Sequence, residues 1–289
     1  MGMNRALAAA GAAIALWATL AWLGVMLRAW PPFLLVGCAL IVGAACSIHR
    51  IREWRVPPGA LALGVYGLFG FHFLLFLALR RAPPVEANLV NYLWPLFIVL
   101  LAPLFVPGMR LGIRHVAAGF AGFAGAALLI TGGRIQLDPA HASGYAMAAG
   151  SALVWATYSL ASRRQPTPTA AIGACCLASG LAAIACHVAL EPRFVPPVRD
   201  LALLGVLGLG PMGAAFYLWD YALKHGDPRT IGAAAYLTPL ASTLLLVASG
   251  QGTLGTAAVA GMALIVGGAA LGALPAGRGP RRLAPRPDT

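Results

Sequence analysis

Two copies of one short pattern carry polar and aromatic side chains that could bind a small molecule. The pattern Tyr-Leu-X-Pro-Leu occurs at 92–96, within VNYLWPLFIVL, and again at 236–240, within AAYLTPLASTL. Tyrosine and asparagine side chains donate and accept hydrogen bonds, and aromatic rings attract cations. The first copy has asparagines close by, at 88 and 91. This combination indicates reversible binding of a solute, without a chemical step.

Helical spacing places these residues on shared faces. Asn88, Tyr92 and Pro95 fall on one face, with Asn91 beside them, and Tyr236, Pro239 and Thr243 fall on the matching face of the second copy. The stretch 142–162 carries Trp155 and Tyr158 on a further stripe with two serines. Trp17 and His72 lie near the middle of other apolar stretches.

Charged residues well inside apolar stretches are nearly absent. Asp220 is the exception, and because it precedes Lys224 by four residues, a helical ion pair and a proton or charge site are both open interpretations. His72 is likewise either a hydrogen-bonded structural residue or a proton carrier. The eight acidic residues stand singly and the five cysteines show no metal-ligand spacing. We therefore expect no catalytic residue, no metal and no cofactor.

The elements that position these side chains are membrane-spanning helices. The chain of 289 residues is 60% hydrophobic and only 10% charged, with a mean hydropathy of +0.81. A helix that spans a bilayer needs about 20 predominantly apolar residues. Ten such stretches occur, at about 6–27, 31–48, 58–79, 85–106, 112–132, 142–162, 169–189, 200–223, 229–249 and 254–274.

The chain also repeats itself. Segments 78–96 and 222–240 align without a gap at an offset of 144 residues, with Tyr92 on Tyr236 and Pro95 on Pro239. Each half then holds five spans, and an odd number makes the second half enter the membrane from the opposite side. We predict an all-α polytopic membrane protein with ten transmembrane helices in two inverted-topology five-helix repeats. The first repeat is expected at 1–137, the second at 138–276 and a basic cytoplasmic tail at 277–289.

The paired prolines lie deep in their spans. About ten residues of helix place each one ~15 Å into a ~30 Å hydrocarbon core. A proline cannot donate an N–H, so the carbonyl four residues earlier, that of Asn91 or Ala235, loses its helical partner. In lipid such a group is tolerated only where protein or a water-filled cavity satisfies it. We predict that both broken helices face one central cavity, and the alternative is a pair of simple kinks.

Basic residues set the expected orientation. Of the 20 Lys and Arg residues, 14 fall on the side of the N-terminus, and positive segments stay in the cytoplasm. Both termini are therefore predicted to be cytoplasmic. Topology and anionic lipid account for the net charge of +12, so no nucleic-acid partner is expected.

The stretches ANLVNYLWPLFIVL at 87–100 and WATYSLASRR at 155–164, with ten spans in two halves, resemble the EamA family of the drug/metabolite transporter superfamily. Within it they are similar to the YddG-type aromatic amino acid exporters. The resemblance covers nearly the whole chain and implies export of aromatic and other neutral amino acids, and of cationic drugs, by alternating access in a bacterial inner membrane. It assigns Asn91, Tyr92, Trp94 and Pro95 to the family motif. The small four-helix relatives carry a glutamate in their first span, and its absence here argues against proton coupling by that route.

The predicted substrate site comprises twelve residues, and Asp220 is a separate candidate charge site. The twelve are Trp17, His72, Asn88, Asn91, Tyr92, Trp94, Pro95, Trp155, Tyr158, Tyr236, Pro239 and Thr243. The expected partners are an amino acid substrate and membrane lipids, and a monomer is compatible with the sequence. Two other functions stay open. A carrier of nucleotide sugars or phosphorylated metabolites would need Arg or Lys in mid-span, and a non-transporting membrane scaffold would need no cavity.

Overall fold

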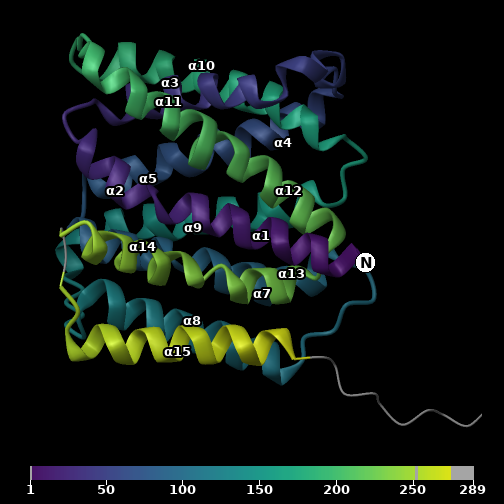
Figure 1. Ribbon diagram of the computed structural model, residues 1–289, viewed down its shortest axis with the longest axis vertical. Helices are drawn as coiled ribbons and strands as arrows, with labels where there is room; N and C mark the ends of the chain where they lie inside the picture. Colours follow the sequence, from purple (N-terminus) through teal and green to yellow (C-terminus); the bar gives the residue numbers. More distant parts are fainter. Residues whose placement is uncertain (1, 251–252, 275–289) are drawn as a thin grey trace, which may run out of the picture.

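Apolar helices run side by side through the molecule (Figure 1). The computed structural model describes residues 2–250 and 253–274, and in these residues every regular element is a helix. The first half contains α1 (Gly2–Ala18), α2 (Leu20–Met26), α3 (Pro32–Ala44), α4 (Pro58–Val65), α5 (Phe71–Leu79), α6 (Pro84–Asn91), α7 (Leu93–Phe105) and α8 (Ile113–Thr131). The second contains α9 (Ala142–Ser162), α10 (Ile172–Leu190), α11 (Leu201–Leu209), α12 (Ala215–His225), α13 (Pro228–Ala234), α14 (Leu237–Ala248) and α15 (Thr256–Ala273).

Prolines begin several of these helices. Pro32, Pro58, Pro84 and Pro228 each stand at the first helical position. A proline suits this place because the N–H that it lacks would have no partner within the helix, and its fixed φ is already helical. The helix starts at 32, 58, 84 and 228 therefore lie within one residue of the predicted starts of their spans.

Within the described residues, nine helices are long and apolar enough to cross a membrane, and the chain is a multi-pass membrane protein. The helix α9 is as long as these, with 21 residues, but it is not among the nine because it is less apolar. Its serines at 151, 159 and 162 are buried inside the protein, where a helix does not need an apolar surface. The predicted tail at 277–289 lies outside the described residues.

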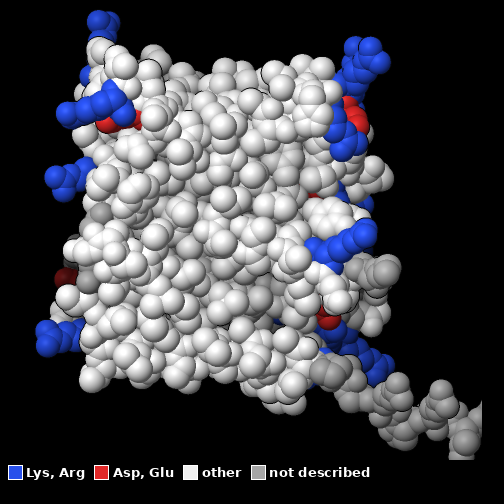
Figure 2. All heavy atoms as spheres, viewed as in Figure 1, with Lys and Arg blue, Asp and Glu red and all other residues white. Residues whose placement is uncertain are grey.

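On the face of the molecule shown in Figure 2, charge lies at the two ends of the helices. Figure 2 shows Lys and Arg along the left and right edges of the face in view, with a broad uncharged band between them. The same view of the ribbon places the start of α1 and the end of α15 at one side of this band (Figure 1). A bilayer that covers the band would leave every one of the basic side chains in view at an interface.

Irregular backbone occurs at corresponding places in the two halves. A π-helical turn joins α4 to α5 at Tyr66–Gly70, and another joins α11 to α12 at Gly210–Ala214, 144 positions later. The helix after each Tyr-Leu-X-Pro-Leu tyrosine also restarts 144 positions apart, with α7 at Leu93 and α14 at Leu237. The predicted interruption near each mid-span proline is therefore present in both spans.

Glycine pairs hold the outer helices together. At the bottom of Figure 1, α8 and α15 lie side by side. A Cβ added to Gly125 would lie 2.6 Å from the carbonyl oxygen of Gly261, and a Cβ added to Gly261 would lie 2.6 Å from that of Gly125. At the top, α3 and α10 meet at Gly37 and Gly180 in the same reciprocal way, at 3.1 and 2.9 Å. Small residues let backbones approach this closely, which is a main source of packing between helices in lipid.

We predict that Gly125→Leu destabilises the protein by forcing α8 and α15 apart. Overpacking of a close contact costs about 1–3 kcal/mol, or roughly 3–10 °C in the unfolding midpoint. Thermal unfolding in detergent, followed by size-exclusion chromatography, measures it. The matched control is Gly267→Leu on α15, where a Cβ meets nothing within 4 Å, and its midpoint should not fall. Equal midpoints for the two variants would contradict the packing role of Gly125.

Candidate functional site

A cavity of about 400 Å³ lies among the helices. Its lining includes Gly24 near the end of α2 and, about one turn into their helices, Leu35 of α3 and Asn88 of α6. Since α1 starts at the opposite end of the molecule and α2 continues it, these residues place the cavity in the half away from the N-terminus. The volume falls in the roughly 300–1,000 Å³ range of small-molecule sites.

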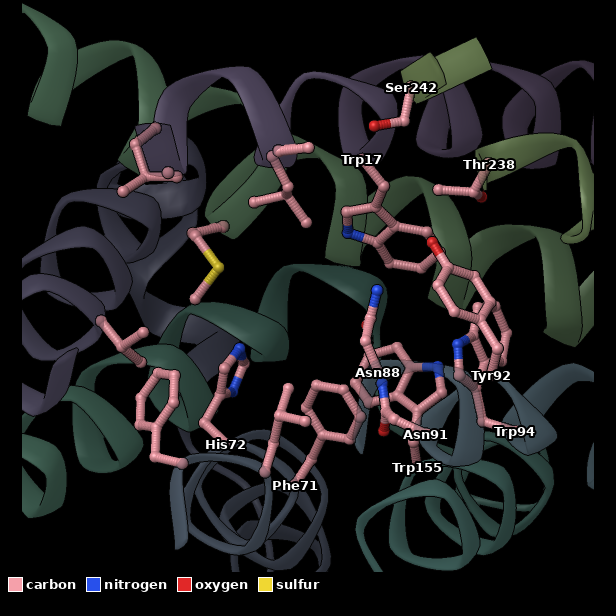
Figure 3. Close-up of a pocket in the computed structure, with 18 of the residues that line it drawn as sticks. Trp17, Phe71, His72, Asn88, Asn91, Tyr92, Trp94, Trp155, Thr238 and Ser242 are labelled. Carbon is pink, nitrogen blue, oxygen red and sulfur yellow. The ribbon is translucent and has the colours of Figure 1, made fainter. Parts of the chain in front are cut away.

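Seven of the predicted site residues line this cavity, namely Trp17, His72, Asn88, Asn91, Tyr92, Trp94 and Trp155. They come from four spans, and Figure 3 shows most of their side chains directed at one common space. The other predicted residues do not line it. Pro95 and Pro239 are buried at the helix interruptions, and Tyr236 is fully buried between helices. Thr243 lies outside the lining, and Tyr158 and Asp220 line a second, smaller cavity.

An aromatic floor closes the inner end of the cavity. We use this name for Trp17, Trp94, Trp155, Phe216 and Trp219, which come from α1, α7, α9 and α12. The ring centroids of Trp17 and Trp219 lie 5.1 Å apart, and those of Trp17 and Trp155 lie 5.8 Å apart. Most of these rings meet edge to face or tilted, the arrangement that aromatic quadrupoles favour.

The indole of Trp17 also provides a hydrogen-bond partner for irregular backbone. Its Nε1 donates a hydrogen bond of 3.1 Å to the carbonyl of Pro211, in the π-helical turn before α12. Irregular backbone at membrane depth requires such a partner, because lipid offers none. The floor and the turn therefore stabilise each other.

Hydrogen bonds fix the polar groups of the cavity. Ser151 Oγ donates to Asn91 Oδ1 at 2.7 Å, which leaves the amide nitrogen of Asn91 as its cavity donor. His72 Nδ1 lies 2.6 Å from the carbonyl of Leu68. A carbonyl can only accept, so Nδ1 carries the proton and, in the neutral ring, Nε2 is a hydrogen-bond acceptor. Thr238 Oγ1 is buried and has no partner among the described residues, so it remains to be satisfied by water or a bound molecule.

Several lining residues were not predicted, among them Thr238, Ser242, Phe71 and Phe216. A signal for Thr238 was present, because it occupies the X position of the second motif copy and corresponds to Trp94 in the first. Thr243 was predicted by extending an unbroken helical stripe through Tyr236. The helix is interrupted at 235–236, so residues beyond the interruption face different neighbours, and Ser242 lines the cavity.

The two motif tyrosines contact each other. Tyr236 Oη donates a 3.1 Å hydrogen bond to the carbonyl oxygen of Tyr92, its equivalent 144 positions earlier. This carbonyl lies at the interruption between α6 and α7, where the backbone of Tyr92 leaves the helical conformation with φ −67° and ψ 6°. A side chain from the second half thus satisfies a backbone group at the break in the first.

The chain matches a known protein family along most of its length. The model of the EamA-like transporter family matches the chain twice, at residues 4–131 and 142–273. The chain belongs to this family. A relative from Ancylobacter novellus named aromatic amino acid exporter YddG is 42% identical over 276 residues, which cover 92% of this chain and 96% of that protein. The Escherichia coli K12 protein of the same name is 27% identical over 213 residues, or 68% of this chain and 70% of that one.

A solved crystal structure has the same fold. It matches with a TM-score of 0.90 and 41% sequence identity, and the match covers 94% of this chain and 97% of that chain. In this EamA-like chain the cavity can hold a solute by ring stacking and a few directed hydrogen bonds. None of its lining residues is Lys, Arg, Asp or Glu in the part of the chain that the structure describes.

We predict that Tyr236→Phe destabilises this EamA-like protein, because the Tyr92 carbonyl then lies in an apolar environment without its hydrogen bond. A buried group left without a partner costs about 1–3 kcal/mol, which thermal unfolding in detergent can measure. Tyr145→Phe is the matched control, since the Tyr145 hydroxyl is buried and has no partner in the described residues. A midpoint that falls equally in both variants would contradict the proposed role of the Tyr236 hydroxyl.

Proposed function

We propose that this transporter exports aromatic and other neutral amino acids from the bacterial cytoplasm. The observation that carries the proposal is the chemistry of the cavity. Three tryptophans, Trp17, Trp94 and Trp155, share it with two asparagines and a histidine, and no charged residue of the described chain lines it. Aromatic walls stack on a planar side chain and attract an ammonium group, at about 0.5–2 kcal/mol per contact. Cationic drugs with an aromatic body fit the same site.

The names of the relatives support this substrate class. Proteins named aromatic amino acid exporter match this chain at 42% and 27% identity. A carrier of nucleotide sugars or phosphorylated metabolites is the alternative, and it would need a cationic group to hold phosphate. The uncharged lining argues against it. A scaffold without transport would have no use for a cavity of this size.

The polar groups of the cavity would orient a bound zwitterion. Asn91 offers amide N–H donors, which suit a carboxylate, and His72 Nε2 offers an acceptor, which suits an ammonium group. Figure 3 shows both side chains at the edge of the same space. In this arrangement the substrate's aromatic ring rests against the indoles of the floor, with its two charged groups toward Asn91 and His72.

The architecture that we propose is a pair of inverted five-helix repeats with ten spans. Its support is the double match of one family model, at 4–131 and 142–273, and the offset of 144 that relates the π-helical turns and the restarts of α7 and α14. Counting α9 as a span gives an even total, which fits a start of α1 and an end of α15 on one side (Figure 1). The boundary between the halves would lie near residue 137.

Orientation follows from the basic residues. Most of the Lys and Arg residues lie on the side of the N-terminus, so we place this side in the cytoplasm of a bacterial inner membrane. The large cavity then faces away from the cytoplasm. Alternating access requires that the two halves also adopt a second arrangement, in which the cavity is reached from the cytoplasm.

We predict that liposomes containing the pure protein take up labelled phenylalanine and, more slowly, threonine, but no phosphorylated sugar. Trp155→Ala should lower phenylalanine counterflow by about tenfold or more, since stacking and packing contacts to a buried indole are worth at least 1.4 kcal/mol, or about a factor of ten. Phe120→Ala is the control, because Phe120 is 52% exposed on the lipid-facing side of α8. Transport of the phosphate ester would reject the substrate class, and full activity of Trp155→Ala would reject the site.

A second prediction concerns the ammonium group. In the parent protein, phenylalanine should compete for transport better than 3-phenylpropionate, which lacks an ammonium group. His72→Phe removes the acceptor and keeps a ring, so the advantage of phenylalanine should shrink by about fivefold, the effect of roughly 1 kcal/mol from one hydrogen bond. Inhibition constants for both compounds in the two proteins measure it. An unchanged ratio would show that His72 does not contact the ammonium group.

A further inference from the structure

A second, much smaller cavity lies on the N-terminal side of the aromatic floor. Its volume is about 30 Å³, enough for a water-sized group and too small for an amino acid. Its lining includes Tyr158, Ser162, Cys175, Asp220 and Lys224, from α9, α10 and α12, together with residues of the segment that joins α9 to α10. The small cavity therefore has a carboxylate and an ammonium group in its lining, among apolar residues of 56–64 and 168–172, whereas no charged residue of the described chain lines the large one.

Charged hydrogen bonds hold this region shut. Asp220 Oδ2 lies 2.9 Å from Lys224 Nζ and accepts a 2.7 Å hydrogen bond from Thr169 Oγ1. Lys224 Nζ donates to the carbonyl of Thr167 at 2.8 Å. Both bonds tie α12 to the segment between α9 and α10, and the Asp220 side chain is only 4% exposed. A buried ion pair of this kind needs good geometry and partners for its remaining groups, which the two threonines provide.

Only a thin partition separates the two cavities. Trp155 lines the large one and Tyr158 the small one, and their ring centroids lie 5.5 Å apart on the same stripe of α9. The Tyr158 ring lies against Gly67 in the π-helical turn before α5, where a Cβ would collide with it. A path through the protein therefore crosses one layer of rings and then meets the ion pair.

We propose that Asp220 and Lys224, with the segment from Gln165 to Thr169, form the cytoplasmic gate, and that the small cavity is its closed vestibule for a zwitterionic amino acid. The direction of the gate rests on the proposed orientation and export function. The neighbouring cytoplasmic contacts close the same side, since Arg163 donates to the carbonyl of Gly226 at 2.7 Å, between the ends of α9 and α12.

The charge of the pair suits the substrate class. Asp220 and Lys224 lie one turn apart on α12, so an opening that moves α12 away from the 165–169 segment would take the Thr169 hydroxyl from Asp220 and the Thr167 carbonyl from Lys224. Loss of these partners in a poorly solvated place is costly. A zwitterion brings a carboxylate for Lys224 and an ammonium group for Asp220, so it replaces each lost partner. A neutral molecule, or one with a single charge, cannot replace both. The gate would then open more readily for the solute that the large cavity accepts.

Cys175 provides a direct reporter of the vestibule. It lines the small cavity and is only 6% exposed. In a protein that retains this cysteine alone, with Cys38, Cys46, Cys176 and Cys186 changed to alanine, a charged methanethiosulfonate reagent should react slowly in nanodiscs, where both faces are accessible. Lys224→Gln and Thr169→Val should each raise the rate by about tenfold or more, because loss of a hydrogen bond to a charged group shifts a two-state equilibrium by this order.

The matched control is Arg50→Gln, which breaks an exposed ion pair with Glu53 on the same side and lines neither cavity. Its labelling rate should equal that of the parent. If Lys224→Gln does not elute as a single species, Thr169→Val decides, since it leaves the ion pair in place. Parent-like labelling in a well-folded gate variant would overturn the proposal. If the gate variants label faster but the parent protein transports no phenylalanine, the result would support the gate and reject the substrate assignment.

Discussion

A helix that is interrupted inside a membrane must find partners for its backbone groups within the protein. The cost of leaving a carbonyl unsatisfied in hydrocarbon is several kcal/mol, on the order of a large part of a protein's stability. Two interruptions here are satisfied by aromatic side chains from other spans. Tyr236 donates to the carbonyl of Tyr92, and Trp17 donates to that of Pro211. Each contact joins the two halves of the chain, so the broken helices and the packing of the halves depend on each other.

The same requirement explains why the cavity is aromatic. The N–H of Trp17 donates to the Pro211 carbonyl, while its ring belongs to the floor. Trp219 likewise donates to Ser159 Oγ at 3.1 Å while its ring packs against Trp17. An indole can do both because it is large and apolar with a single donor at one edge. The floor is therefore held by hydrogen bonds at its rim, and its faces remain for stacking on a solute.

The sequence predicts the helices well because their signals are local. A proline at the first helical position and an apolar run of the right length set the starts of the spans at Pro58 and Pro84 within one residue. The interruption near Tyr92 follows in the same way from Pro95, and the four predicted residues beside it, Asn88, Asn91, Tyr92 and Trp94, line the cavity. The contact between Tyr92 and Tyr236 and the position of Ser242 depend on how the halves pack and on the altered direction of α14 after its interruption. No local spacing encodes either.

The two motif copies share their backbone and differ in their side chains, and this difference explains why the span of the first copy contributes more residues to the lining of the larger cavity than the span of the second. The first copy carries Asn88 and Trp94 into the lining. The second carries Gly232 at the position of Asn88, and a Cβ there would already lie 3.0 Å from Ile98 of α7. Small residues let α13 close tightly against α7, whereas asparagine and tryptophan hold space open beside α6. Equivalent interruptions thus produce a close helix contact in one place and a binding surface in another.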